Sequence, residues 1–164
     1  MIDDEAEFNA FVAARSAALS RTAYLLTGDR HLAEDLLQTA LLQTARNWHR
    51  IHTAPEPYAR RVLYNENISR WRRRKFSEVA LGAHDRPTSG AAPELRLSLE
   101  QALARLTLKQ RTMLVLRYFE DLTEVQAAAA LDVSVGTVKS TTRQALNRLR
   151  VLAPELAELI GVTP

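Results

Sequence analysis

The chain has 164 residues, of which 46% are hydrophobic and 25% are charged, a composition typical of packed globular domains rather than of a disordered chain. It contains no cysteine, which excludes disulfides and thiolate metal sites. It has no apolar run of the roughly 18 residues that a membrane span needs, and its acidic N-terminus lacks the apolar core of a signal peptide. The sequence therefore predicts a cytoplasmic protein without membrane insertion.

The net charge is +3, and its distribution along the chain is uneven. Residues 56–75 carry a net charge of +5, and residues 101–164 carry +2. Residues 1–55 and 76–100 each carry −2. Two separated basic segments indicate a polyanionic partner that is contacted at two places.

No segment alternates polar and apolar residues as a half-buried strand would, so the pattern predicts an all-α fold. Apolar residues recur at three- and four-residue spacing over residues 8–26, where Thr27-Gly28 ends the predicted helix. Asp29 is a candidate N-cap for a second helix. Its predicted inward stripe is Leu32, Leu36, Ala40, Ala45 and Trp48. A third helix is expected over residues 57–75.

Residues 76–94 lose this periodicity and contain glycine, proline and serine, which is typical of a linker. The sequence thus predicts two small helical domains, residues 5–75 and 95–150, followed by a short tail, residues 151–164. The tail is expected to pack back on the second domain.

The second domain is predicted to contain four helices, and two of their starts carry capping boxes. Thr107-Leu-Lys-Gln begins one helix and Thr123-Glu-Val-Gln begins another, which ends near Leu131. Ser134 is the candidate cap of the last helix, expected to run to Leu149.

The segment from Thr123 to Arg150 has the pattern of a helix-turn-helix, with small residues at Ala127–Ala130 and a tight turn at Leu131–Val133. The predicted inward positions of its last helix are Val138, Ala145, Leu146 and Leu149. The predicted outward positions are Thr137, Lys139, Ser140, Arg143, Gln144 and Asn147. Those side chains suit phosphates and base edges. A solvated face on a helical bundle is the alternative, which the turn and the capping boxes disfavour.

The run from Leu116 to Ser140, which ends in Gly-Thr-Val-Lys-Ser, resembles region 4 of sigma-70 family RNA polymerase sigma factors. It is most similar to the extracytoplasmic-function (ECF) group, in the SigE-like family of actinobacteria. In that family this domain reads the −35 promoter element. The resemblance implies −35 contacts by Thr137, Lys139, Ser140, Thr141 and Arg143, to which the outward face adds Gln144. The chain departs from the family at Thr141, where many members carry Arg.

The segment Ala33-Glu-Asp-Leu-Leu-Gln-Thr-Ala-Leu-Leu42 resembles sigma region 2.2, whose helix docks on the clamp helices of the polymerase β′ subunit. The polymerase-binding residues that the resemblance implies are Asp35, Gln38, Thr39 and Leu42. An acidic residue is common in the family at the position of Thr39. Glu34 and Asp35 also suit a helix N-terminus by their charge, but that does not account for the rest of the match.

Residues 57–76 resemble sigma regions 2.3 and 2.4, which read and open the −10 element. The cations that could contact phosphates are Arg60, Arg61, Arg70, Arg72, Arg73, Arg74 and Lys75. The rings that could stack on an unpaired base are Tyr58, Tyr64 and Trp71. Asn65 and Asn67 supply amides for a base edge. For Tyr58 and Trp71, core packing is an equally strong alternative.

The resemblance implies a sigma factor that binds core RNA polymerase and directs promoter-specific initiation through the −10 and −35 elements. The partners that it implies are the β′ clamp helices and β flap of core polymerase and promoter DNA. Many members of the family are also held inactive by an anti-sigma factor. No catalytic residue, cofactor or metal is expected.

Two other classes of protein compete with this interpretation. A LuxR-type helix-turn-helix regulator would normally carry a receiver or ligand-binding domain, yet no strand pattern or phosphoacceptor site is present. An enzyme is disfavoured because no P-loop, nucleophile elbow or Gly-rich loop occurs. His49 and His52 have the spacing of metal ligands, but no nearby carboxylate completes a site.

Overall fold

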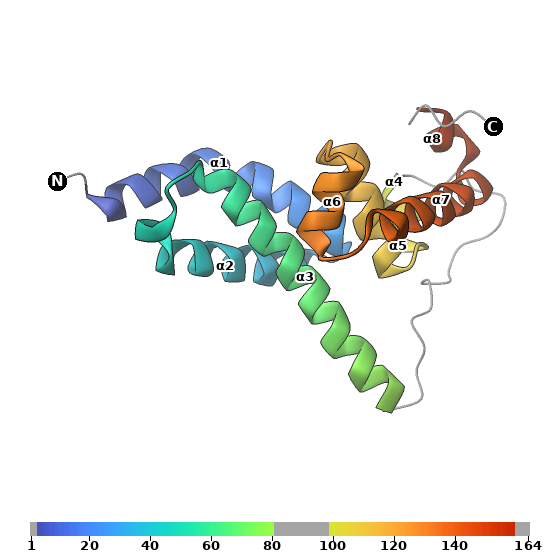
Figure 1. The fold of residues 1–164 in the computed structure, drawn as a ribbon, viewed down its shortest axis with the longest axis horizontal. Coiled ribbons are helices and arrows are strands. Elements are labelled where there is room, and N and C mark those ends of the chain that lie inside the picture. Colours follow the sequence, from blue (N-terminus) through green and yellow to red (C-terminus); the bar gives the residue numbers. More distant parts are fainter. Residues whose placement is uncertain (1–2, 81–98, 160–164) are drawn as a thin grey trace. The chain divides into compact units, whose positions relative to one another are not determined.

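The computed structural model describes the backbone of residues 3–80 and 99–159 and the side chains of residues 3–73 and 99–158. Within those ranges the chain forms helices without β-strands, which confirms the all-α prediction. The chain divides into two compact units, Met1–Arg70 and Trp71–Pro164, and the boundary falls within the third helix; Figure 1 labels the helices. The predicted linker, residues 76–94, lies outside the described residues except for 76–80, which continue the third helix.

The first unit is built from two long helices, one short 3-10 turn and the part of a third long helix that ends at Arg70. These are α1 (Asp4–Thr27), α2 (Arg30–Arg46), η1 (Trp48–Arg50) and α3 (Pro55–Ala80). Gly28 ends α1 with a φ of 70°, and the Asp29 side chain accepts a hydrogen bond from the Leu32 backbone, so both predicted caps are confirmed. The predicted end of α3 at Lys75 is wrong, because residues 76–80 contain no glycine or proline to stop it.

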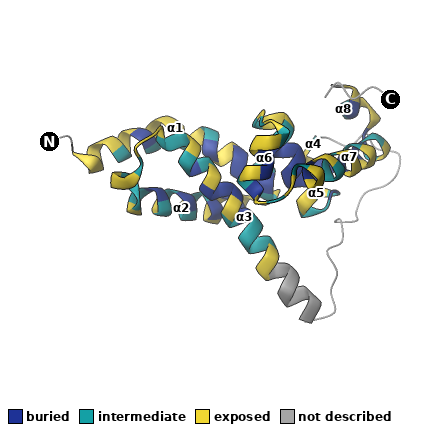
Figure 2. Ribbon diagram, viewed as in Figure 1, coloured by how far each residue is buried: buried dark blue, intermediate teal, exposed yellow. Residues whose placement is uncertain are grey.

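Leucine side chains from all three helices form the core of the first unit (Figure 2). Its fully buried leucines are Leu19, Leu26, Leu36 and Leu63. Trp48 closes one end of the unit, where its ring lies 5.3 Å from that of Phe8 and 5.5 Å from that of Phe11.

The buried stripe of α2 differs from the predicted one. Leu32, expected inside, is 41% exposed, whereas Ala33 is buried and Thr44 is fully buried. The stripe therefore runs through Ala33, Leu36, Ala40 and Thr44, and Ala45 is only half-buried. The prediction followed the larger apolar side chains, but alanine at two positions of this stripe permits a close approach of α2 to α1.

The second unit contains the predicted helix-turn-helix. Its elements are α4 (Leu99–Ala104), α5 (Leu108–Leu114), the π-helical turn η2 (Val115–Phe119), α6 (Glu124–Leu131), α7 (Val135–Leu152) and α8 (Pro154–Leu159). Both capping boxes are present, at Thr107 and at Thr123, and the Ser134 side chain caps α7. Asp132 turns the chain between α6 and α7 with a φ of 54°.

The tail packs back on the second unit, as predicted. The α8 helix contacts α7, and two small residues beside this contact, Ala153 and Ala157, are buried. The residues after Leu159 lie outside the described part of the chain.

The capping box at Thr123 gives a first prediction. The Thr123 hydroxyl accepts from the Gln126 backbone at 3.1 Å, so Thr123→Ala leaves a donor of the first turn of α6 unsatisfied. We expect this variant to lower the free energy of unfolding by about 1 kcal/mol in urea denaturation followed by circular dichroism. Val125→Ala is the matched control, because Val125 is 67% exposed in the same helix. A loss no larger than that of the control would contradict the role of the cap.

Candidate nucleic-acid interface

The α7 helix buries one face and exposes the other. Val138, Ala145 and Leu149 are fully buried, which fixes the rotation of the helix. Four of the predicted −35 residues are exposed opposite them: Thr137, Lys139, Arg143 and Gln144. The other two, Ser140 and Thr141, are half-buried. The predicted inward and outward sets are confirmed except at Leu146, expected inside, and Ser140, expected outside, which are both half-buried.

The Arg143 side chain has no internal hydrogen-bond or ion-pair partner within the described part of the chain. Ser140, by contrast, donates its hydroxyl proton to the Thr137 carbonyl at 3.2 Å, and Asn147 accepts from Arg150 at 3.1 Å. The Arg143 guanidinium is exposed and keeps its donors for a ligand. A planar fork of this kind suits a phosphate or a guanine edge.

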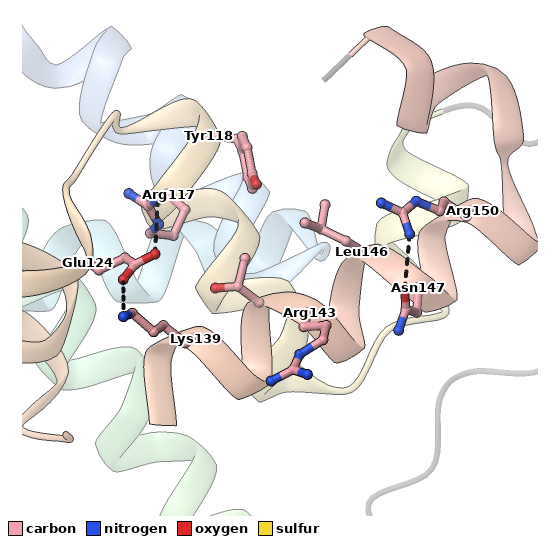
Figure 3. A pocket seen from close by; sticks show the side chains of 9 residues that line it. Arg117, Tyr118, Glu124, Lys139, Arg143, Leu146, Asn147 and Arg150 are labelled. Atoms are coloured by element: carbon pink, nitrogen blue, oxygen red, sulfur yellow. Dashed lines mark hydrogen bonds and ion pairs between the residues drawn. The ribbon is translucent and has the colours of Figure 1, made fainter. Parts of the chain in front are cut away.

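A carboxylate lies beside the N-terminal half of α7. The two oxygens of Glu124 reach two different cations: Oε2 is 3.7 Å from Lys139 Nζ, and Oε1 is 4.0 Å from Arg117 Nη2 (Figure 3). Arg117 is further held because it donates to the Leu122 carbonyl in the turn before α6. Sequence reasoning missed Arg117 and Glu124, since Glu124 was considered only as part of a capping box.

The predicted −10 residues on α3 fall on different sides of the helix. Arg61, Asn65, Arg72 and Arg73 are exposed. Three of these, Arg61, Asn65 and Arg72, are spaced by four and seven residues and therefore share one helix face. Their cationic and amide groups can meet phosphates and a base edge together.

The remaining members of the predicted set differ in burial. Tyr64 and Asn67 are each 4% exposed, which places them in the core of the first unit. Tyr58 and Trp71 are half-buried. The side chains of Arg74 and Lys75 lie outside the described residues.

Two arginines of the set, Arg60 and Arg70, form bonds within the first unit. Arg60 donates to Thr22 on α1 at 2.9 Å and pairs with Glu56 at 2.9 Å. Arg70 donates to Thr39 on α2 at 3.0 Å and pairs with Glu66 at 3.4 Å. These contacts join α3 to both neighbouring helices.

The predicted polymerase-binding residues gather on the exposed side of α2. Asp35 and Gln38 are exposed, and the large apolar side chain of Leu42 is 57% exposed. Leu32 belongs to the same side of the helix, at a spacing of three residues from Asp35. Thr39 is half-buried and accepts the hydrogen bond from Arg70.

The helix-turn-helix of the second unit, with its cationic outward face, and the arginine-rich helix α3 are together typical of a DNA-binding protein. Within the described ranges, none of the helices combines the length and apolar character that crossing a bilayer needs.

Comparison with known proteins also divides the chain into two parts. The family description Sigma-70 region 2 matches residues 11–77, and Sigma-70, region 4 matches residues 96–149. The chain is 41% identical over 149 residues to the RNA polymerase sigma-E factor of Streptomyces coelicolor, covering 88% of this chain and 84% of that protein. It is 32% identical over 160 residues to the ECF RNA polymerase sigma factor SigL of Mycobacterium tuberculosis, covering 90% and 87%.

A solved structure is also similar to the chain. It is the sigma factor RpoE in complex with the anti-sigma factor NepR from Bartonella quintana, with a TM-score of 0.66 and 25% identity. The match covers 89% of this chain and 96% of that one. The chain belongs to the sigma-70 family of RNA polymerase sigma factors, in its ECF group.

The internal bonds of Arg60 generate a second prediction. Arg60→Ala removes hydrogen bonds to Thr22 and Glu56, and we expect it to lower the free energy of unfolding by about 1 to 2 kcal/mol. Arg61→Ala is the matched control, because Arg61 is the adjacent, exposed arginine, and its effect should stay within about 0.5 kcal/mol. Urea denaturation of the full chain measures both. Equal stability of the two variants would refute a structural role for Arg60.

Proposed function

We propose that the chain binds core RNA polymerase through its first unit and directs transcription initiation by contacting the −10 element with α3 and the −35 element with α7. The observation that carries the proposal is the separation of faces on α7. Val138 and Leu149 are fully buried, while Lys139 and Arg143 are exposed on the other side. A helix fixed in this way presents a constant set of donors to the major groove.

In this proposal the −35 duplex is read by Thr137, Lys139, Ser140, Thr141, Arg143 and Gln144. Arg143 is the strongest candidate for a base contact because its donors are unused within the described part of the chain. Lys139 and Thr137 lie nearer the N-terminal end of α7 and suit phosphate oxygens, which fix the register of the helix on DNA.

The −10 element is assigned to α3. Arg61 and Arg72 supply phosphate contacts from its exposed face, and Asn65 between them supplies a base-edge amide. The half-buried rings of Tyr58 and Trp71 are the described aromatic candidates for stacking on an unpaired base. Arg60, Arg70, Tyr64 and Asn67 support this helix from its inner side, by hydrogen bonds and by burial in the core.

Core polymerase is assigned to the exposed side of α2. Asp35 and Gln38 supply polar contacts there, and the apolar side chain of Leu42 supplies area to bury against the β′ clamp helices. The β flap is the proposed contact of the second unit. Bond formation belongs to the polymerase in this proposal, and the chain acts in the cytoplasm as a non-catalytic subunit. The solved relative is bound to an anti-sigma factor, so an anti-sigma factor is a further proposed partner.

Transcription reconstituted with sigma-free core polymerase tests the −35 assignment. The wild-type chain should give specific transcripts from a promoter library. Arg143→Ala should reduce initiation at a −35-dependent promoter by about tenfold, which corresponds to the loss of one good base contact. Its affinity for core polymerase should not change.

Arg148→Ala is the matched control for that experiment. Arg148 is an exposed arginine of the same helix, but it bonds to the Arg105 carbonyl at 3.4 Å instead of facing the proposed DNA surface. Equal losses in the two variants would sink the −35 assignment. DNA binding without any initiation would indicate an ordinary regulator instead of a sigma factor.

The exposed face of α3 gives a further prediction. The double variant Arg61→Ala/Arg72→Ala should slow open-complex formation and flatten its dependence on the logarithm of salt concentration. If both residues contact the single strand, the slope should fall by about 1.4, which is about 0.7 per phosphate contact. Potassium permanganate reactivity of unpaired thymines measures the opening.

The matched control for the −10 variant is Arg21→Ala/Arg50→Ala. It removes the same charge from exposed positions of α1 and η1, outside the proposed DNA face. An unchanged salt slope in Arg61→Ala/Arg72→Ala, or an equal change in the control, would count against the assignment of α3.

A further inference from the structure

The surface beside α7 is hollowed. A cavity of about 220 Å³ opens there, lined by residues of η2, α6 and α7 (Figure 3). Four of the lining side chains are cationic: Arg117, Lys139, Arg143 and Arg150. Glu124 is the single carboxylate among the lining residues in the described part of the chain. The hollow is therefore mainly cationic, as an anion-binding surface would be, and the Glu124 carboxylate is an anion of the chain itself within it.

The position of that anion is specific. Glu124 is the first residue of α6, directly after the Thr123 cap, so its backbone is held by the capping box. One carboxylate oxygen is directed to Lys139 and the other to Arg117, at 3.7 and 4.0 Å. Glu124 is 37% exposed and Lys139 is 61% exposed, so the pair lies at the surface that DNA would approach.

We propose that Glu124 takes the place of a DNA phosphate between Lys139 and Arg117 and thereby limits the sequence-independent affinity of the second unit for duplex DNA. A phosphate carries the same sign of charge and seeks the same donors as a carboxylate. Lys139 can engage the DNA backbone only by sharing its charge with Glu124 or by leaving it. The duplex therefore gains less from this lysine than from an unpaired one.

Competition by Glu124 would favour sequence-specific over sequence-independent DNA binding. Phosphate contacts supply essentially all of the affinity for arbitrary DNA, whereas base contacts supply the discrimination. Glu124 moderates a phosphate-type contact and leaves Arg143, which has no internal partner in the described residues, available for a base. The proposal rests on the proposed function, because it requires the outward face of α7 to meet DNA.

Glu124 also has an ordinary structural role, and the two roles predict opposite results. A carboxylate in the first turn stabilises a helix through its dipole. If that were its main contribution, loss of the carboxylate would weaken α6 and with it the DNA interface. If Glu124 competes with phosphate, loss of the carboxylate tightens binding.

The test uses the full chain carrying Glu124→Gln, bound to core polymerase. Affinity is measured on a promoter fragment and on a fragment lacking both promoter elements, over a series of potassium chloride concentrations. We expect about three- to fivefold tighter binding to both fragments at low salt, in line with the strength of an exposed ion pair. The slope against the logarithm of salt concentration should steepen by up to about 0.9, the value for one duplex phosphate.

Three further variants test this explanation. Glu158→Gln removes an exposed carboxylate of α8 that does not line the hollow, and its affinities should match those of the wild type. In a Lys139→Gln background, Glu124→Gln should give a clearly smaller gain, because the lysine that it would release is absent. Glu124→Ala should reproduce the gain of Glu124→Gln. Poor folding of α6 cannot imitate these results, since it weakens binding.

Unchanged or weaker binding by both Glu124 variants, while Lys139→Gln weakens binding to the promoter fragment, would overturn the inference and leave the proposed function intact. If Lys139→Gln and Arg143→Ala both left binding to the promoter fragment unchanged, the proposed function itself would be wrong.

Discussion

The rotation of α7 about its own axis is the constraint on which the second unit depends. Val138, Ala145 and Leu149 are fully buried, and burial of a Val or Leu side chain contributes roughly 1.5 to 3 kcal/mol. Turning the helix far enough to change its outward residues would return these side chains to water. The buried stripe therefore places Lys139 and Arg143 on the outward face, which is the face that we assign to DNA.

Local chemistry made much of this fold predictable from the sequence. The Gly28 cap and the capping boxes at Thr107 and Thr123 involve only residues three or four positions apart. The local sequence therefore contains all the residues that form them. The inward and outward positions of α7 followed from a clear apolar period. The two-unit helical architecture followed from these local patterns, together with the loss of periodicity after residue 75.

The sequence was less informative where polar residues face inward. Asn67 and Tyr64 carry groups suited to DNA, yet both are buried, because the tertiary partners of α3 could not be read from residue type. The prediction for Leu32 was wrong in the opposite sense, because this large apolar side chain is exposed while Ala33 is buried. On α2 the choice between these neighbours depends on how closely α1 can approach, and that distance is a property of the packed unit.

The arginines of α3 show how one residue type serves both stability and recognition. Arg60 and Arg70 bond to Thr22 and Thr39, so they fix α3 against α1 and α2. Thr39 lies on the helix that we assign to polymerase, and its bond to Arg70 therefore links the docking helix directly to the helix that we assign to the −10 element. A displacement of α2 would therefore move the hydrogen-bond partner of Arg70. Counting basic residues indicates the segment that we assign to the −10 element. Only the partners of each arginine separate the side chains that hold the helix from those that it can offer to DNA.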